Sequence, residues 1–402
     1  MTAKPVALFT GTSQSPMESR EQQILPTVSP EERKDPAKYR TEPDLVAAVN
    51  VAITLGMPLL ITGEPGCGKS QLAYRVAWEL GFVKHTQVNG KQIIKADLEK
   101  FSVKSTTESG DLFYTFDTIG RFHASRNGDK TANGDNASTV QARNFIHYQA
   151  LGKAILNGLG RNQVSSDIIS DKQKAKLDTA PRRSVVLIDE IDKAPRDVPN
   201  DILNEIDNME FSIPELQRDE PLGLPANLQH NRPIVIITSN SERDLPEAFL
   251  RRCVFYHLAF PLFEQDLQAE HNSQDNSQSN EPKNTSNRVT VEDILQSQFP
   301  EYFSDSNLRA SAIALMRLIR QHATAYYKAP SMAEFINCFD FLFKYCIQQG
   351  IAMQLQQSLQ AHFTSPAQKH ILSNAVNQTL FKNTSDMQLA KNSLDHWLAS
   401  SM

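Results

Sequence analysis

A glycine-rich segment in the first fifth of the chain has the residue types and the spacing that phosphate binding requires. The segment Gly63-Glu64-Pro65-Gly66-Cys67-Gly68-Lys69-Ser70 has the pattern G-x-x-x-x-G-K-S, and Gln71 follows it. Glycines let successive backbone N–H groups turn inward around a phosphate, because no Cβ obstructs them. The Lys69 ammonium is then placed to reach the β- and γ-phosphates, and the Ser70 hydroxyl to hold Mg²⁺. We therefore predict that residues 63–71 bind a nucleotide with its metal.

The sequence on either side of this segment predicts the elements that hold it in place. The apolar run Met57–Thr62 precedes it and has the character of a buried strand. Apolar residues follow it at helical spacing, and Gly81 is placed to end that helix: they are Leu72, Ala73, Val76, Ala77 and Leu80. Because a helix N-terminus carries the positive end of the helix dipole, this order favours an anionic ligand. The alternative is a glycine turn that merely joins a strand to a helix.

A second motif, further along the chain, supplies two adjacent carboxylates. The apolar run Val185–Ile188 predicts a buried strand that ends in Asp189 and Glu190. In a parallel sheet, the C-terminal ends of the strands face the ligand crevice. We predict that Asp189 binds Mg²⁺, directly or through water, and that Glu190 activates the water that attacks the γ-phosphate. Alternatively, the pair simply caps the strand.

Two more segments carry polar groups suited to the same phosphates. The β-branched run Ile234–Thr238 predicts another buried strand, and Asn240 follows it closely. The Asn240 amide is placed to hold the attacking water or the γ-phosphate, or else serves as a turn residue. Pro246–Arg252 predicts a short helix that ends in Arg251 and Arg252. These arginines either form a solvated helix end or supply an arginine finger to a neighbouring subunit's nucleotide.

The first part of the chain leads into an α/β nucleotide-binding domain, which we expect to span residues 41–262. Residues 1–40 are polar and bear prolines, and they are interpreted as an arm or linker. Thr41 and Asp44 predict the N-cap of a helix, which runs from about Glu42 to Leu55 and stops at Gly56. The other expected elements are a strand at Phe101–Lys104, a helix at Val198–Met209 and a short hairpin within 210–232.

An insertion and a linker interrupt this plan. Residues 105–160 form the predicted insertion, with a mobile polar loop at 125–139 and a helical period from Phe145 to Leu159. Residues 263–290 are rich in Gln, Asn and Ser and form a predicted linker. Residues 291–402 have no strand pattern, and two apolar stripes in them predict packed helices rather than a cofactor site. The predicted fold class is therefore α/β, a three-layer parallel sheet followed by a small all-helical domain.

Composition excludes several other classes of protein. The chain has 402 residues, of which 40% are hydrophobic and 22% charged, enough for two or three domains with cores. The net charge of −5 gives no support to a strongly basic nucleic-acid surface. Four scattered cysteines without a C-x-x-C pair argue against a disulfide framework or a zinc site. No apolar run approaches the ~20 residues of a membrane helix and no signal pattern begins the chain, so we expect a cytoplasmic protein without membrane contact.

Taken in this order, the motifs resemble the AAA+ ATPases, and more narrowly their MoxR-like branch with an insertion at helix 2. Three stretches carry the resemblance: Leu59–Gly66, Val186–Pro195 and Leu245–Leu250. The resemblance implies a P-loop NTPase core with a small helical lid, ATP and Mg²⁺ as cofactors, and a homo-oligomeric ring, usually a hexamer. By position, Asn240 matches the first sensor of the family. Arg252 matches the arginine finger best, with Arg251 as the neighbouring candidate.

Two positions depart from the family pattern. Relatives often place a second-sensor arginine on the lid, in a Gly-Ala-Ser-Pro-Arg run that aligns with Lys328–Met332, so that Met332 stands at the arginine position. Lys328 is a candidate substitute; otherwise the resemblance implies looser coupling of lid and nucleotide and slow hydrolysis. Cys67 inside the loop is the second departure. It is either a small filler or, at a helix N-terminus, a thiol with a lowered pKa.

Three functions from different classes are compatible with this sequence. The first is an ATP-hydrolysing chaperone or remodeller of a protein partner, since family members commonly act with proteins that bear a von Willebrand factor A domain. The second is a nucleic-acid motor of a restriction or defence system, which the acidic balance disfavours and which Lys104 and Arg121 near the insertion keep open. The third is a nucleotide-controlled scaffold that scarcely turns over, motivated by Met332.

Overall fold

The computed structural model divides the chain into two compact units. The first comprises Thr41–Ala259, and the second comprises the segment before Thr41 together with Phe260–Met402. The structure describes the following residues: 35–88, 91–126, 142–240, 242–268, 288–303, 306–348, 351 and 353–399. Most of the predicted arm at 1–40, of the loop at 125–139 and of the linker at 263–290 lies outside the described residues.

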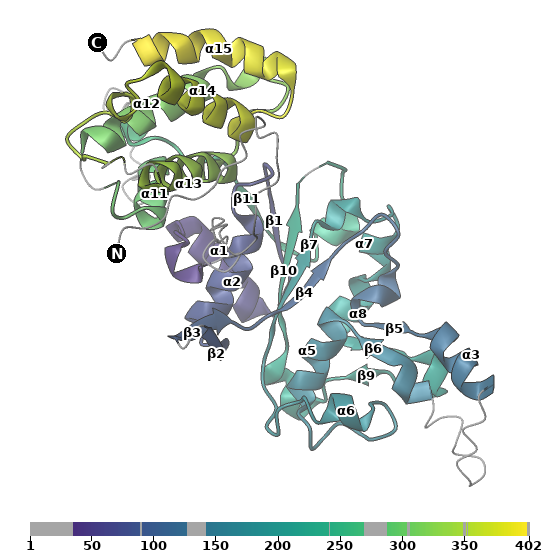
Figure 1. The fold of residues 1–402 in the computed structure, drawn as a ribbon. Helices are drawn as coiled ribbons and strands as arrows, with labels where there is room; N and C mark the ends of the chain where they lie inside the picture. Colours follow the sequence, from purple (N-terminus) through teal and green to yellow (C-terminus); the bar gives the residue numbers. More distant parts are fainter. Residues whose placement is uncertain are drawn as a thin grey trace, which may run out of the picture. The chain divides into compact units, whose positions relative to one another are not determined.

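The first unit is built on a five-stranded parallel sheet of order β11-β1-β10-β7-β4 (Figure 1). Its strands are β1 (Leu59–Gly63), β4 (Glu99–Ser102), β7 (Val185–Asp189), β10 (Ile234–Ser239) and β11 (Val254–Leu258). The three central strands β1, β10 and β7 are buried along their whole length. Strands covered on both faces are continuous apolar runs, which is why they could be recognised in the sequence. The parallel α/β fold class is confirmed.

Helices cover the two faces of the sheet. On one side, α1 (Pro43–Leu55) packs against β1 and β11, and α2 (Lys69–Glu79) packs against β7, β1 and β10 (Figure 1). On the other side, α5 (Ala150–Leu159) packs against β4 and β7. Alternate strand residues such as Leu60, Val186 and Ile237 share one hydrophobic cluster with α5. The sheet therefore lies between two helical layers, as the sequence predicts.

The first helix ends as predicted but begins differently. Its C-cap is Gly56, at φ 64°, in the left-handed region that glycine adopts most easily. Its N-cap is Glu42 and makes no side-chain capping bond, so the predicted Thr41 cap with Asp44 at N3 is wrong. Pro43 at the first helical position fixes a helical φ and has no N–H to be left unpaired there.

Four strands of the first unit differ from the sequence prediction. The strand expected at Phe101–Lys104 is Glu99–Ser102, two residues earlier. The hairpin of β2 (Val83–Val88) and β3 (Lys91–Ala96) was not predicted. Neither was β11, where side chains alternate between half-buried and exposed because it is an edge strand. Its Phe255 is 55% exposed, so the strand lacks the uniform burial that produces an apolar run.

The region predicted as an insertion contains its own small elements. These are β5 (Tyr114–Phe116), α3 (Thr118–Arg126) and β6 (Ile146–Tyr148), and β5 pairs with β6 in antiparallel fashion. The helix expected from Phe145 begins only at Ala150, because Ile146 is paired with Phe116 in this ladder. The remaining part of the expected helix, Ala150–Leu159, is α5, which packs on the sheet.

Short elements connect β7, β10 and β11. They are α7 (Val198–Asp201), α8 (Leu203–Asn208), β8 (Glu210–Phe211), β9 (Leu222–Gly223) and α9 (Glu247–Leu250), whereas α6 (Asp171–Lys174) precedes β7. The single helix expected at Val198–Met209 is interrupted at Ile202, which caps both α7 and α8. The predicted hairpin is confirmed, since β8 and β9 pair antiparallel.

The second unit is helical throughout its described elements. Its helices are α11 (Val291–Gln298), α12 (Asn307–Gln321), α13 (Met332–Gln348), α14 (Pro366–Leu380) and α15 (Thr384–Ala399). Phe339 and Phe343 of the predicted aromatic stripe stack on each other in its core, and Phe303 meets both rings edge-on. Met332 is only 3% exposed and belongs to this core. Among the described helices, none has the length and apolar character needed to span a membrane.

Candidate functional site

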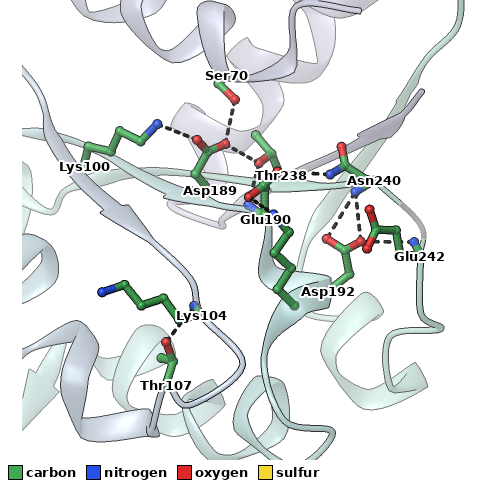
Figure 2. A network of polar contacts seen from close by, with 11 residues as sticks. Ser70, Lys100, Lys104, Thr107, Asp189, Glu190, Asp192, Thr238, Asn240 and Glu242 are labelled. Carbon is green, nitrogen blue, oxygen red and sulfur yellow. Dashed lines mark hydrogen bonds and ion pairs between the residues drawn. The ribbon is translucent and has the colours of Figure 1, made fainter. Parts of the chain in front are cut away.

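The two sequence motifs meet at the C-terminal edge of the sheet. Ser70 lies in the first turn of α2, and its Oγ donates a hydrogen bond of 2.6 Å to Oδ1 of Asp189, the last residue of β7 (Figure 2). Thr238, near the end of β10, donates to the same oxygen at 2.8 Å. Because β7 and β10 are adjacent parallel strands, their C-terminal residues lie side by side. The site is therefore assembled from a helix start and two strand ends.

The carboxylate of Asp189 is held in its ionised form. Burial alone would raise its pKa. Hydrogen bonds from Lys100, Ser70 and Thr238, together with the charge of Lys100, outweigh that effect, so the pKa lies below the usual value. Its second oxygen, Oδ2, lies 2.5 Å from Nζ of Lys100 in β4. Lys100 and Thr238 were not predicted as parts of the site. Two features of the sequence could have indicated them. Thr238 places a hydroxyl at the end of an otherwise aliphatic strand, and Lys100 comes just before the expected strand at Phe101–Lys104.

Glu190 lies beside Asp189 in an unusual backbone conformation. Its φ of 63° and ψ of 54° place it in the left-handed region, which costs a non-glycine residue about 1–2 kcal/mol. Its backbone N–H donates to Oγ1 of Thr238 at 2.9 Å, and this bond helps to hold the conformation. Its side chain accepts from Nδ2 of Asn240 at 3.3 Å and lies 2.5 Å from Nζ of Lys193. The structure thus brings Glu190 and Asn240, two predicted site residues, into contact.

Asp192 organises the loop that carries Asn240. It is 3% exposed, and its carboxylate accepts hydrogen bonds from the backbone N–H groups of Asn240 (3.2 Å) and Glu242 (3.0 Å) (Figure 2). A buried carboxylate requires such donors, because an unpaired one is costly. Asp192 was not predicted as a site residue, although it follows the acidic pair closely in the sequence. It acts on the site by fixing the backbone from which the Asn240 amide extends.

The phosphate loop has the backbone that its glycines allow. Gly66 and Gly68 have φ of 82° and 100°, and Gly68 is the N-cap of α2. The loop approaches β11 closely, since a Cβ added to Gly63 would lie 2.2 Å from the carbonyl oxygen of Leu258. Nζ of Lys69 donates to the carbonyl oxygens of Gly63 (2.8 Å) and Glu64 (2.9 Å), at the mouth of the loop.

Burial has a larger effect on Cys67 than the helix terminus does. Desolvation raises the pKa of its thiol, and the nearby charge of Lys69 and the backbone hydrogen bonds only partly offset this. A raised pKa means less thiolate at neutral pH, so the suggestion of an activated thiol is wrong. The interpretation of Cys67 as a small filler remains.

The two predicted finger residues lie on the helix end before β11. Nη2 of Arg251 is 2.7 Å from Oε1 of Glu247, and Nε of Arg252 is 3.3 Å from Oδ2 of Asp207. The side chain of Arg251 is 75% exposed and that of Arg252 is 42% exposed. Within the described part of the chain, neither arginine joins the hydrogen-bonded network around Asp189. Both are thus presented on the surface of the unit.

The donor set at the strand ends suits magnesium. Mg²⁺ prefers oxygen ligands and usually binds through one or two carboxylates together with phosphates and water. A hydroxyl and a carboxylate oxygen, from Ser70 and Asp189, lie side by side next to the phosphate loop. The metal would supply positive charge to the phosphates there. The residues present therefore fit the predicted cofactor.

A parallel sheet with a glycine loop after one strand, and an acidic pair at the end of the strand two positions away, defines a P-loop nucleotide-binding protein. A model of the family AAA, "ATPase family associated with various cellular activities", matches residues 59–262, just over half of the chain. The chain therefore belongs to the AAA family of ATPases. The matched residues include the phosphate loop, the acidic pair, Asn240 and both arginines.

Comparison with individual proteins adds little to this. A solved structure from Cytophaga hutchinsonii, named "putative ATPase", is 13% identical, with 92% of this chain and 93% of that chain covered and a TM-score of 0.32. Such a score carries no argument about function. No curated protein matches the chain.

Proposed function

We propose that this AAA protein is a Mg²⁺-dependent, ATP-hydrolysing remodeller of the MoxR-like type, which works as a homo-oligomeric ring, a hexamer, on a partner protein. The observation that carries the proposal is the contact of Ser70 with Asp189, with Glu190 and Asn240 hydrogen-bonded next to it. Proteins with a von Willebrand factor A domain are the partners that the resemblance indicates. The cytoplasm is the proposed location.

In this proposal, each side chain has one task. Residues 63–71 bind the phosphates, and Lys69 exchanges its carbonyl partners for phosphate oxygens. Ser70 and Asp189 hold the metal. Glu190 accepts a proton from the attacking water, and the Asn240 amide keeps the Glu190 carboxylate and that water in place. Two lysines, Lys100 and Lys193, neutralise the acidic pair.

The exposed arginines support a site that is completed by a second subunit. Arg252 carries positive charge on the surface of the unit and is proposed as the finger, with Arg251 as its neighbour. A guanidinium that arrives from a neighbouring subunit stabilises charge in the transition state and is worth about 10³–10⁵ in turnover. Because AAA proteins are typically oligomeric, such an exchange between subunits is available.

Subunit mixing tests both the base and the finger. We expect Glu190→Gln to bind ATP without hydrolysing it, and Arg252→Ala to bind ATP but hydrolyse it at least about a hundredfold more slowly. A mixture of the two inactive variants should recover hydrolysis, because the Arg252→Ala subunit retains its base and receives a finger from the other subunit. Arg251→Ala is the matched control and should keep most of its activity.

The outcome separates the alternatives. Recovery in the mixture supports a shared site in a ring. If the mixture stays inactive although the variants co-assemble in light scattering, Arg252 does not act in trans. If Glu190→Gln hydrolyses ATP at the wild-type rate, the proposed ATPase site itself is refuted.

A further inference from the structure

A lysine outside the predicted motifs contacts the carboxylate at the centre of the site. Lys100 lies in the edge strand β4, and its Nζ is 2.5 Å from Oδ2 of Asp189 (Figure 2). In the parallel ladder of β4 and β7, Ser102 is opposite Asp189 and Lys100 is opposite Leu187. Because side chains alternate along a strand, Lys100 and Asp189 extend from the same face of the sheet. The sheet register therefore brings the ammonium to the site.

The three donors to Asp189 are not equivalent. Ser70 and Thr238 donate neutral hydroxyls to Oδ1, whereas Lys100 brings a full positive charge to Oδ2. Without Lys100 the two hydroxyls would still orient the carboxylate. What the site would lose is charge, in a region where Asp189 is only 12% exposed and electrostatic interactions are less screened than in water.

This charge lies where a nucleotide site needs it. The phosphates of a nucleotide repel carboxylates such as Asp189, and a divalent cation normally offsets that repulsion. Lys100 already neutralises the same carboxylate from within the chain. Lys69, the lysine of the phosphate loop, adds a second ammonium, which contacts the carbonyl oxygens of Gly63 and Glu64.

We propose that Lys100 is a positioning residue whose charge, held on Asp189, lets the site bind ADP or ATP even when no divalent cation is present. The inference rests on the proposed nucleotide site and adds a specific electrostatic role to it. Lys100 acts through Asp189 and through attraction of the phosphates, and a bound divalent cation would supply the same neutralising charge.

The test compares nucleotide affinity with and without metal. We measure the Kd of the fluorescent analogue mant-ADP in EDTA and in saturating Mg²⁺ for the full-length protein and for Lys100→Met and Lys100→Arg. In EDTA, Lys100→Met should bind about tenfold more weakly than wild type, because one favourable charge is lost. In Mg²⁺ the loss should be less than about twofold, since the cation supplies the charge. Lys100→Arg keeps the charge and should restore binding in EDTA.

A second lysine provides the matched control. Nζ of Lys84 in β2 lies 2.5 Å from Oδ1 of Asp97, an ion pair of the same length that is separate from the network around Asp189. Lys84→Met should leave the ratio of the two Kd values at the wild-type level. Urea unfolding without nucleotide shows whether each variant is folded.

The results distinguish the inference from the function on which it rests. If Lys100→Met loses the same mant-ADP affinity in EDTA and in Mg²⁺, the ion pair is merely structural and the inference is overturned. An unchanged affinity under both conditions would overturn it as well. In both cases the proposed ATPase site stands. If the wild type binds mant-ADP under neither condition, the proposed site and this inference fall together.

Discussion

The hydroxyl of Ser70 and the carboxylate of Asp189 are 2.6 Å apart, although 119 positions separate them in the chain. This hydrogen bond joins the end of the phosphate loop to the C-terminal end of β7. It is possible because only the phosphate loop separates β1 from α2, and because β10 alone lies between β1 and β7. The chemistry proposed for the site depends on that adjacency, since one metal would have to be held by both side chains, by Asp189 either directly or through water.

Replacing Asp189 with Asn should test its proposed role in metal binding and reveal its effect on stability. The variant loses the ion pair with Lys100, so we expect the free energy of unfolding to fall by about 1–3 kcal/mol at neutral pH. Because the pKa of Asp189 is lowered in the folded state, its stabilising contribution is full above its unfolded pKa, about 3.9. The contribution is lost as the pH falls through the lower folded value.

Urea unfolding of wild type and Asp189→Asn between pH 3 and pH 7 checks this, and the Mg²⁺ dependence of ATP hydrolysis checks the metal role. The difference in unfolding free energy between wild type and Asp189→Asn should be constant above about pH 5 and become smaller below about pH 4. A gap that widens on acidification would contradict the assignment.

Replacing Asp192 with Ala should disturb the site from a distance. The backbone N–H groups of Asn240 and Glu242 lose their acceptor, and we expect a loss of about 1–3 kcal/mol in unfolding free energy. The displaced Asn240 amide should lower kcat for ATP at least about tenfold, since small misplacements near a reacting centre have large effects. Asp201→Ala, at an exposed acid of α7, is the control for both measurements. Unchanged kcat in a folded Asp192→Ala protein would show that this loop does not position the site.

Replacing Gly63 with Ala should be among the most damaging small changes. The new methyl group would meet the carbonyl oxygen of Leu258 at 2.2 Å, at a backbone φ of 149°. We expect the unfolding free energy to fall by about 2–4 kcal/mol. We also expect the variant to lose mant-ADP binding. For Gly110→Ala, where nothing lies within 4 Å, the change should stay within about 0.5 kcal/mol. Equal stability of the two variants would contradict the close approach.

Replacing Met332 with Arg would introduce the residue type that the family resemblance leads us to expect on the lid, but the structure indicates a different result. Met332 is packed in the core of the helical unit, where an unpaired guanidinium is costly. We expect a loss of about 3 kcal/mol or more, measured by denaturant unfolding. Leu389→Arg, at a position 54% exposed, should have little effect. A stable Met332→Arg protein with tighter nucleotide binding would show that the position is a sensor site after all.

The parts of the fold that the sequence predicts well are those in which burial is uniform. β1, β7 and β10 are central strands, and each appears in the sequence as an apolar run ending in polar residues. Edge strands such as β4 and β11 are partly exposed, so their residues mix polar and apolar types. They therefore lack the continuous apolar run that identifies a central strand. The capping error at Thr41 has a local cause, because Pro43 shifts the helix start without a side-chain cap.

The site divides in the same way. The phosphate loop and the acidic pair are contiguous motifs, and their sequence alone indicates their place at strand ends. Lys100, Thr238 and Asp192 contribute through contacts between different elements, which depend on strand register. The Lys100 contact in particular follows from the pairing of Ser102 with Asp189, and no local pattern in the sequence specifies that pairing.

The contact between Gly63 and Leu258 lies where the chain leaves the first unit. Leu258 is the last residue of β11, and the helical unit begins at Phe260. The polypeptide that connects the two units therefore leaves from beside the first glycine of the phosphate loop. A side chain added at Gly63 would therefore have to displace β11, the strand from which the chain leaves this unit.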